Sequence, residues 1–94
     1  MIKTFACKRT ESFFRDGKVP KFLSGTVKEI AARKLLMLHF ASDFRDLRVP
    51  PGNRLESLKG DRKGQCSIRI NDQYRICFRF EKGNAFDVEI TDYH

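Results

Sequence analysis

The chain has 94 residues, of which 40% are hydrophobic and nine are phenylalanine. This length suits one domain with a small core, so we expect a single domain over residues 1–94. No apolar run reaches the roughly 18 residues of a membrane-spanning helix and no cleavable signal follows Met1, which excludes a membrane protein and predicts a cytoplasmic one.

Charge is the second global feature. Nineteen Lys and Arg residues against 12 Asp and Glu give a net charge of +7. Such an excess favours polyanionic partners, most often nucleic acid, although it is also compatible with an acidic protein partner. The three cysteines form an odd count without metal-ligand spacing, which predicts reduced thiols, no bound metal and no cofactor.

The N-terminal half predicts a short strand followed by two helices. Residues 2–7 alternate as in a strand, and residues 9–16 suit a short helix that ends at Gly17. Thr26 and Glu29 have the spacing of a capping box, so we expect them to open a long helix over residues 26–41.

The long helix has two apolar strips. The wider strip predicts a core-facing side made of Val27, Ile30, Ala31, Leu35, Met37, Leu38 and Ala41. The second strip, Ala32, Leu36 and Phe40, either packs on the first helix or is covered in part by a partner protein. His39 lies near the polar edge of the helix, where we expect a solvated side chain.

A connector and a strand follow. Residues 42–53 interleave acidic and basic side chains, and the prolines within 49–52 exclude a helix or a central strand there. Residues 54–59 predict the next strand, and the glycine-bounded residues 60–64 predict the turn that follows it.

The C-terminal half predicts an antiparallel hairpin around Asn71 and Asp72. Apolar residues alternate with polar ones on both sides of this pair. The inner face is expected to hold Cys66, Ile68, Ile70, Tyr74, Ile76, Phe78 and Phe80. The outer face then carries Arg69, Arg75 and Arg79, as a phosphate-rich partner requires.

The register of the last strand can be predicted from which of its residues are even-numbered and which are odd-numbered. Opposed residues share a face, so their position numbers must sum to an even value if all the apolar residues point inward. A three-residue loop at Lys82–Asn84 meets this condition. It opposes Phe80 to Phe86, Phe78 to Val88, Ile76 to Ile90 and Arg79 to Asp87. This register places the terminal residues Asp92, Tyr93 and His94 beside Tyr74 and Arg75.

Together these elements predict an α+β fold with two N-terminal helices packed on a small, mainly antiparallel sheet. The terminal residues supply a carboxylate, a phenol and an imidazole, while Arg75 and Lys59 are nearby cations. RNA cleavage without a metal needs a base for the 2′-hydroxyl, cations for the phosphorane and an acid for the departing 5′-oxygen. A polar chain end is also commonly just a frayed tail, so the residues alone leave both interpretations open.

The motifs of the C-terminal half resemble the HigB branch of the RelE/ParE toxin superfamily. The matching stretches are Val49–Glu56, Leu58–Gly64, Ser67–Asn71, Tyr74–Phe78 and Asp87–His94. The resemblance implies a RelE-like fold and a ribosome-dependent mRNA endonuclease that works without a metal or cofactor. It also implies a toxin that a helix-turn-helix HigA-type antitoxin neutralises, with operator DNA bound only through the antitoxin.

The resemblance also assigns site residues. It implies catalytic roles for Lys59, Arg75, Asp92, Tyr93 and His94. Arg75 and Lys59 would stabilise the phosphate, and Asp92 and His94 would transfer protons. Tyr93 would stack on a base or orient the phosphate.

Two positions depart from the family pattern. Glu56 stands where some relatives carry a histidine, so it is either a carboxylate base or without a catalytic role. Gln73 stands where some relatives carry an asparagine that contributes to the site.

Other residues are expected to bind partners. Arg62 and Lys63 suit contacts with the ribosomal RNA backbone, and Arg69 and Arg79 are either ribosomal RNA contacts or surface charge. Leu36 and Phe40 are the candidates for antitoxin binding.

Two other functions stay open at this point. The superfamily includes ParE-like inhibitors of DNA gyrase, although an inhibitor needs no proton-transfer groups. A non-catalytic nucleic-acid-binding module is the second alternative.

Overall fold

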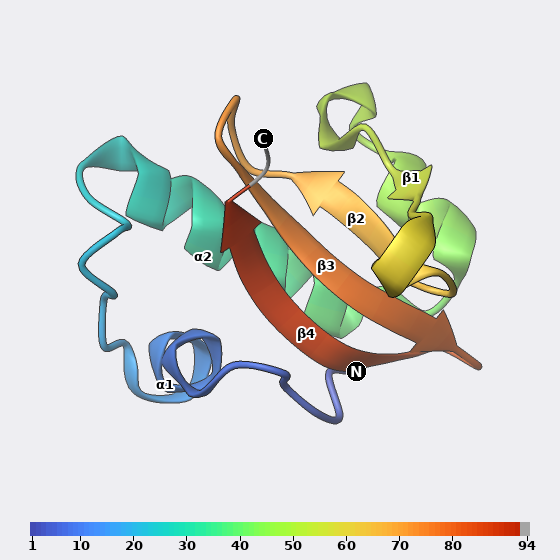
Figure 1. Ribbon diagram of the computed structural model, residues 1–94, viewed down its shortest axis with the longest axis horizontal. Coiled ribbons are helices and arrows are strands. Elements are labelled where there is room, and N and C mark those ends of the chain that lie inside the picture. Colours follow the sequence, from blue (N-terminus) through green and yellow to red (C-terminus); the bar gives the residue numbers. More distant parts are fainter. Residues whose placement is uncertain (93–94) are drawn as a thin grey trace.

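The computed structural model describes residues 1–92, and two helices pack there on a four-stranded antiparallel sheet with strand order β1-β2-β3-β4 (Figure 1). The helices are α1 (Lys8–Asp16) and α2 (Thr26–Phe40). The strands are β1 (Glu56–Ser57), β2 (Cys66–Arg69), β3 (Tyr74–Glu81) and β4 (Asn84–Asp92). The predicted α+β class is therefore confirmed. Neither helix has the length and apolarity that crossing a bilayer requires.

The two helices begin and end for different reasons. As predicted, α1 ends at Gly17, whose φ of 72° is a left-handed cap. The predicted capping box of α2 is wrong. Gly25 is the N-cap, with a φ of 59° and no side-chain cap, and Thr26 is already helical, so its hydroxyl does not cap the first turn. The helix stops at Phe40, one residue before the expected end.

The core lies between α2 and the inner face of the sheet. The fully buried side chains Leu35 and Leu38 of α2 belong to the same apolar cluster as Ile68, Ile76 and Phe78 of the sheet. The first apolar strip of the helix thus faces the core as its spacing predicted.

The N-terminal segment forms less than the predicted strand. It meets the outer edge of β4 in two isolated parallel bridges, Ile2 with Ala85 and Phe5 with Val88. His39 is not simply solvated, because its Nδ1 accepts a hydrogen bond of 3.1 Å from the backbone N–H of Ile2.

The connector contains two 3₁₀ helices, η1 (Phe44–Arg48) and η2 (Pro51–Asn53). The expectation that the prolines within 49–52 exclude a helix is wrong, because η2 begins at Pro51. Asp43 and Asp46 form a reciprocal capping box on η1, an interaction that the charge alternation did not reveal. The predicted strand over 54–59 shrinks to the two residues of β1. A third 3₁₀ helix, η3 (Gly60–Arg62), lies in the expected turn.

The hairpin of β2 and β3 has the predicted faces, with Ile68 opposite Ile76 and Arg69 opposite Arg75. The predicted register of the last hairpin is correct for only part of its length. Ile76 opposes Ile90 as predicted, but the loop has two residues, Lys82 and Gly83, and Phe80 opposes Ala85.

A β-bulge separates the part of the last hairpin that has the predicted register from the part that does not. The register shifts between Cys77 and Arg79, and Asp87 takes a φ of 55°. Phe86 consequently opposes Arg79 on the outer face, with the guanidinium 4.9 Å from the ring centroid, and does not face the core as predicted. The extra residue restores even parity, so Asp92 still lies opposite Tyr74.

Candidate active site

Arg75 is the most constrained cation of the sheet's outer face. It is only 6% exposed, which corrects the expectation of an open arginine on that face. Its Nε donates a hydrogen bond of 2.7 Å to Ser67 Oγ, and its Nη2 donates one of 2.6 Å to the carbonyl of Arg54. Both of these acceptors are neutral oxygens, and together they hold the guanidinium in place.

A carboxylate stands beside this guanidinium. Glu56 of β1 lies opposite Ser67, and its Oε1 is 3.6 Å from Arg75 Nη2. The structure therefore brings Glu56 to the predicted site, although it stands where some relatives carry histidine.

Asp92 and Gln73 join the same end of the sheet. Asp92 lies opposite Tyr74, one position along from the pair that Arg75 makes with Thr91. Its Oδ2 accepts a hydrogen bond of 3.2 Å from Gln73 Nε2. Asp92, Gln73, Arg75 and Glu56 are thus gathered from three strands and a turn. The predicted site residues Tyr93 and His94 lie outside the described residues.

Lys59 directly precedes η3. It is exposed and is the N-cap residue of that 3₁₀ helix, three residues after Glu56. Its role as the second phosphate-binding cation beside Arg75 stays a prediction.

The other arginines predicted to bind RNA form ion pairs with carboxylates. Arg62 lies 2.8 Å from Glu89, and Arg69 is paired with Asp72. Arg79 binds Glu81 at 2.7 Å and Asp87 at 3.4 Å; the hydrogen bond to Glu81 is the main cause that raises its pKa. Of the four residues predicted to bind RNA, Lys63 is the exposed cation with no ion pair among the described residues.

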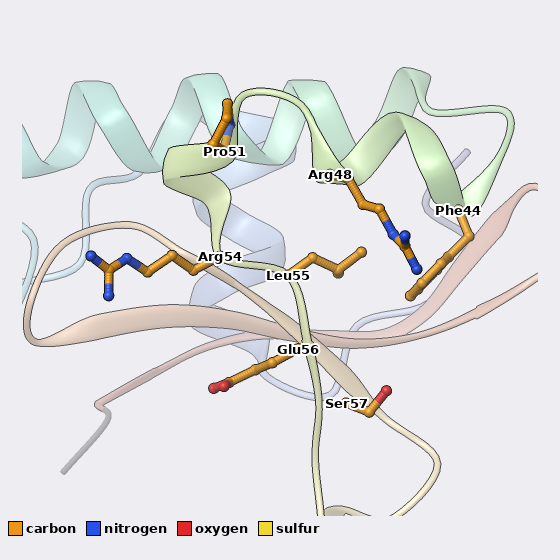
Figure 2. A pocket seen from close by; sticks show the side chains of 7 residues that line it. All are labelled: Phe44, Arg48, Pro51, Arg54, Leu55, Glu56 and Ser57. Atoms are coloured by element: carbon orange, nitrogen blue, oxygen red, sulfur yellow. The ribbon is translucent and has the colours of Figure 1, made fainter.

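A hollow of about 410 Å³ borders the site. Figure 2 shows that Arg54 and Glu56 point to one side of the chain segment they share, whereas Leu55 and Ser57 point to the other side, where Arg48 and Phe44 lie. The alternation of an extended segment thus divides its side chains between two sides, and residues from both sides line the hollow. Sequence reasoning did not predict this hollow.

Sequence reasoning also missed a buried support behind Arg54. Asn53 is fully buried and accepts a hydrogen bond from the ammonium of Lys34, which is 8% exposed. Its Nδ2 donates to the carbonyl of Leu47 at 3.1 Å. Burial lowers the pKa of Lys34, and the like charges of Arg33 and Arg69 lower it further.

This support fixes the carbonyl that holds Arg75. Arg54 follows Asn53 directly and has a φ of 44°, a conformation that a non-glycine residue keeps only when its surroundings enforce it. The available signal was Lys34 itself, a charged residue between the buried helix positions Ala31 and Leu35.

The second apolar strip of α2 is only partly covered. Ala32 packs against the core, but Leu36 is 49% exposed and Phe40 is 77% exposed. Leu36 also borders a small hollow of about 130 Å³ between the two helices, which Phe13 and Phe14 line. Packing on the first helix therefore accounts for Ala32 and leaves the other two residues open.

The described site supplies one fixed cation, the carboxylate of Glu56 beside it, and the carboxylate of Asp92 at the same end of the sheet. Residues 1–92 contain no cluster of three His, Cys, Asp or Glu side chains arranged to hold a metal ion. Positive charge at a phosphate and carboxylates that accept protons are the elements of metal-independent phosphoryl transfer.

Comparison with known proteins adds the family. Residues 3–94 match the family model described as the RelE-like toxin of type II toxin–antitoxin system HigB. "Toxin HigB-1" of Vibrio cholerae is 41% identical over 87 residues, covering 93% of this chain and 92% of that protein. "Endoribonuclease HigB" of Proteus vulgaris is 33% identical over 94 residues, the full length of both chains.

A solved structure agrees on the fold. The YoeB–YefM complex from Staphylococcus aureus contains a chain that superposes with a TM-score of 0.60 over 100% of this chain and 95% of its own length. Because the two chains are only 17% identical, this similarity supports the fold alone. The family match and the two relatives go further: this chain belongs to the HigB family of RelE-like toxins of type II toxin–antitoxin systems.

Proposed function

We propose that this toxin is an endoribonuclease that cleaves translated mRNA on the ribosome without a metal, and so inhibits growth in the cytoplasm. The observation that carries the proposal is Arg75, a buried guanidinium that donates to the neutral oxygens of Ser67 and Arg54 and lies 3.6 Å from the Glu56 carboxylate, at the end of the sheet where Asp92 opposes Tyr74. Membership of the toxin family and the name of the Proteus vulgaris relative support the same activity.

The chemistry is an internal transesterification. The 2′-oxygen of the RNA attacks the adjacent phosphorus, the bond to the 5′-oxygen breaks, and a 2′,3′-cyclic phosphate and a 5′-hydroxyl remain. One group takes the 2′-hydroxyl proton and another gives a proton to the departing oxygen.

Asp92, Glu56 and His94 are our candidates for these two proton transfers. Arg75 stabilises the negative charge of the phosphorane, and Lys59 adds a second cation. The hydrogen bond from Gln73 orients the Asp92 carboxylate, and Tyr93 positions the phosphate or stacks on a base.

His94 is the sharpest test of this assignment. Loss of one positioned acid–base group typically slows a reaction by about 10²–10⁴-fold. We expect His94→Ala to reduce single-turnover cleavage on programmed ribosomes by that factor, and the unfolding midpoint of the variant is measured in parallel to check its fold. Cleavage within a few-fold of the wild type would move the chemistry to Glu56, Lys59 and Arg75.

Mapping of mRNA 5′ ends after induction separates the proposal from other functions. New ends inside translated frames support the nuclease. DNA breaks or altered supercoiling without such ends would instead indicate a gyrase inhibitor, and neither change would indicate a binding module.

We also propose that a HigA-type antitoxin covers the exposed apolar residues Leu36 and Phe40 of α2. Two large apolar side chains on one helix face, beside a hollow between the helices, suit an apolar segment of a partner protein. We expect Leu36→Asp to weaken co-purification with the antitoxin at least tenfold. Lys28→Asp, on an exposed position of the same helix, is the matched control and should bind normally.

A further inference from the structure

A second hollow, of about 330 Å³, lies between the first turns of α1 and the segment that follows this helix. We call it the basic hollow; it is lined by Lys8, Arg9, Ser12, Lys18, Val19, Pro20 and Lys21. Its four basic side chains belong to exposed residues. Sequence reasoning assigned no role to them.

The charge of the basic hollow is not neutralised. None of its four basic side chains forms an ion pair with a described acidic residue, and the neighbouring carboxylate of Glu11 is paired with Arg15 at 3.0 Å. The arginines predicted to bind RNA behave in the opposite way, because Arg69 and Arg79 are each paired with carboxylates. The basic hollow therefore gathers four exposed cations that no described carboxylate pairs.

The backbone around the basic hollow is well defined. The N–H of Gly17 donates to the carbonyl of Phe13, and the N–H of Lys18 donates to that of Ser12, which closes the helix end. Pro20 is buried, and its carbonyl accepts the N–H of Leu23. The lysines thus extend from a fixed turn and not from a loose tail.

Aromatic rings connect the basic hollow to the candidate active site. The guanidinium of Arg9 lies 5.5 Å from the ring centroid of Phe22, and the Phe22 ring lies 5.4 Å from that of Tyr74. Tyr74 is directly opposite Asp92 in the sheet. The basic hollow and the site are therefore joined by two half-buried rings, an arrangement of cations and aromatic surfaces that suits single-stranded RNA.

We infer that the basic hollow binds backbone phosphates of the same RNA strand that is cleaved, away from the bond that breaks, with Phe22 and Tyr74 along the path. This inference rests on the proposed nuclease function. The alternative source of phosphates, ribosomal RNA, is less favoured because the aromatic path leads from the basic hollow directly to Asp92.

The test measures affinity on ribosomes as a function of salt. The probe is an mRNA with a 2′-deoxy nucleotide at the cleavage position, which binds but cannot react, and mRNA-free ribosomes are the comparison. The variant Lys8→Gln/Lys18→Gln/Lys21→Gln removes three cations from exposed positions, and a thermal melt checks its fold. The control Arg69→Gln/Arg79→Gln removes two cations that carboxylates already pair.

We expect the triple variant to lower the slope of log K against log salt on programmed ribosomes by about 2, at about 0.7 for each phosphate of the single strand that a lysine no longer neutralises. The slope on mRNA-free ribosomes and the slope of the control should stay unchanged. An equal decrease with and without mRNA would assign the basic hollow to ribosomal RNA and overturn the inference, as would an unchanged slope.

Cleavage of unmodified mRNA at saturating protein separates this inference from the proposed function. The triple variant should need a higher protein concentration to reach its maximal rate, because its lysines bind the substrate strand, and the maximal rate itself reports the reacting groups. A wild-type protein that binds programmed ribosomes with the expected slope but cleaves nothing would refute the nuclease and leave the binding site standing.

Discussion

Arg75 and Arg79 lie four residues apart on the same face of β3, yet their surroundings differ. Arg75 is buried and donates hydrogen bonds to the neutral oxygens of Ser67 and Arg54. Arg79 is partly exposed, binds the carboxylates of Glu81 and Asp87, and lies over Phe86. Arg75 also has a carboxylate neighbour, Glu56, at 3.6 Å from its Nη2. Strand periodicity places a cation on a face, but tertiary contacts decide how deeply it is buried and how firmly it is held.

Among the residues compared here, the largest effect on cleavage should follow the loss of the planar guanidinium of Arg75. Arg75→Lys keeps the charge but not the planar set of donors that reaches Ser67 and Arg54 together. We expect single-turnover cleavage to fall about 10²–10³-fold, the typical effect of one lost charge-stabilising donor. We also expect a loss of about 1–3 kcal/mol of stability in urea unfolding, because buried acceptors lose their donor.

The matched variant is Arg79→Lys. It should change both quantities little, because its carboxylate partners are exposed and still accept a lysine. Equal losses of cleavage in the two variants would contradict the difference between them.

A smaller effect on cleavage should come from the support behind Arg54. Asn53→Ala leaves the buried ammonium of Lys34 without its acceptor, which should cost about 1–3 kcal/mol in urea unfolding. Cleavage by the folded protein should fall roughly tenfold, because a displaced Arg54 carbonyl no longer holds Arg75. Lys34→Met in the Asn53→Ala background should restore part of the stability but not the cleavage. Recovery of both would show that Asn53 contributes only to stability.

The smallest effect should come from the other paired cations. Arg69→Gln removes a charge that Asp72, an exposed residue, already pairs. We expect a change of stability within about 0.5 kcal/mol and a cleavage rate within about twofold of the wild type. A decrease of more than about tenfold in cleavage would mean that Arg69 contacts RNA despite its ion pair.

The contrast between the two arginines also explains what the sequence could and could not predict. Alternation of apolar residues was enough to place Ile68, Ile76 and Ile90 inside and to bring Asp92 beside Tyr74. It could not reveal that residues 54–57 cover Arg75, because that contact joins segments far apart in the chain. The helix pattern likewise did not indicate a partner for Lys34, because its acceptor, Asn53, belongs to a separate 3₁₀ helix.

The ion pairs of the outer face were hidden for the same reason. Arg62 reaches Glu89 across the sheet, and nothing in the local sequence around either residue marks the contact. The lysines of the basic hollow, which no carboxylate within residues 1–92 pairs, were hidden in the same way, because only the tertiary structure decides whether a charge has a partner.

The bulge at Asp87 has a consequence for how this protein tolerates changes in length. Asp87 and Val88 of β4 together stand opposite Phe78, so deleting Asp87 would leave a regular ladder in which Ile90 still opposes Ile76 and Asp92 still opposes Tyr74. Deleting one codon between Val88 and Asp92 would instead turn every later residue to the opposite face and displace Asp92 from Gln73. In evolution, single-codon deletions should therefore be tolerated at the bulge and excluded from the stretch that follows it.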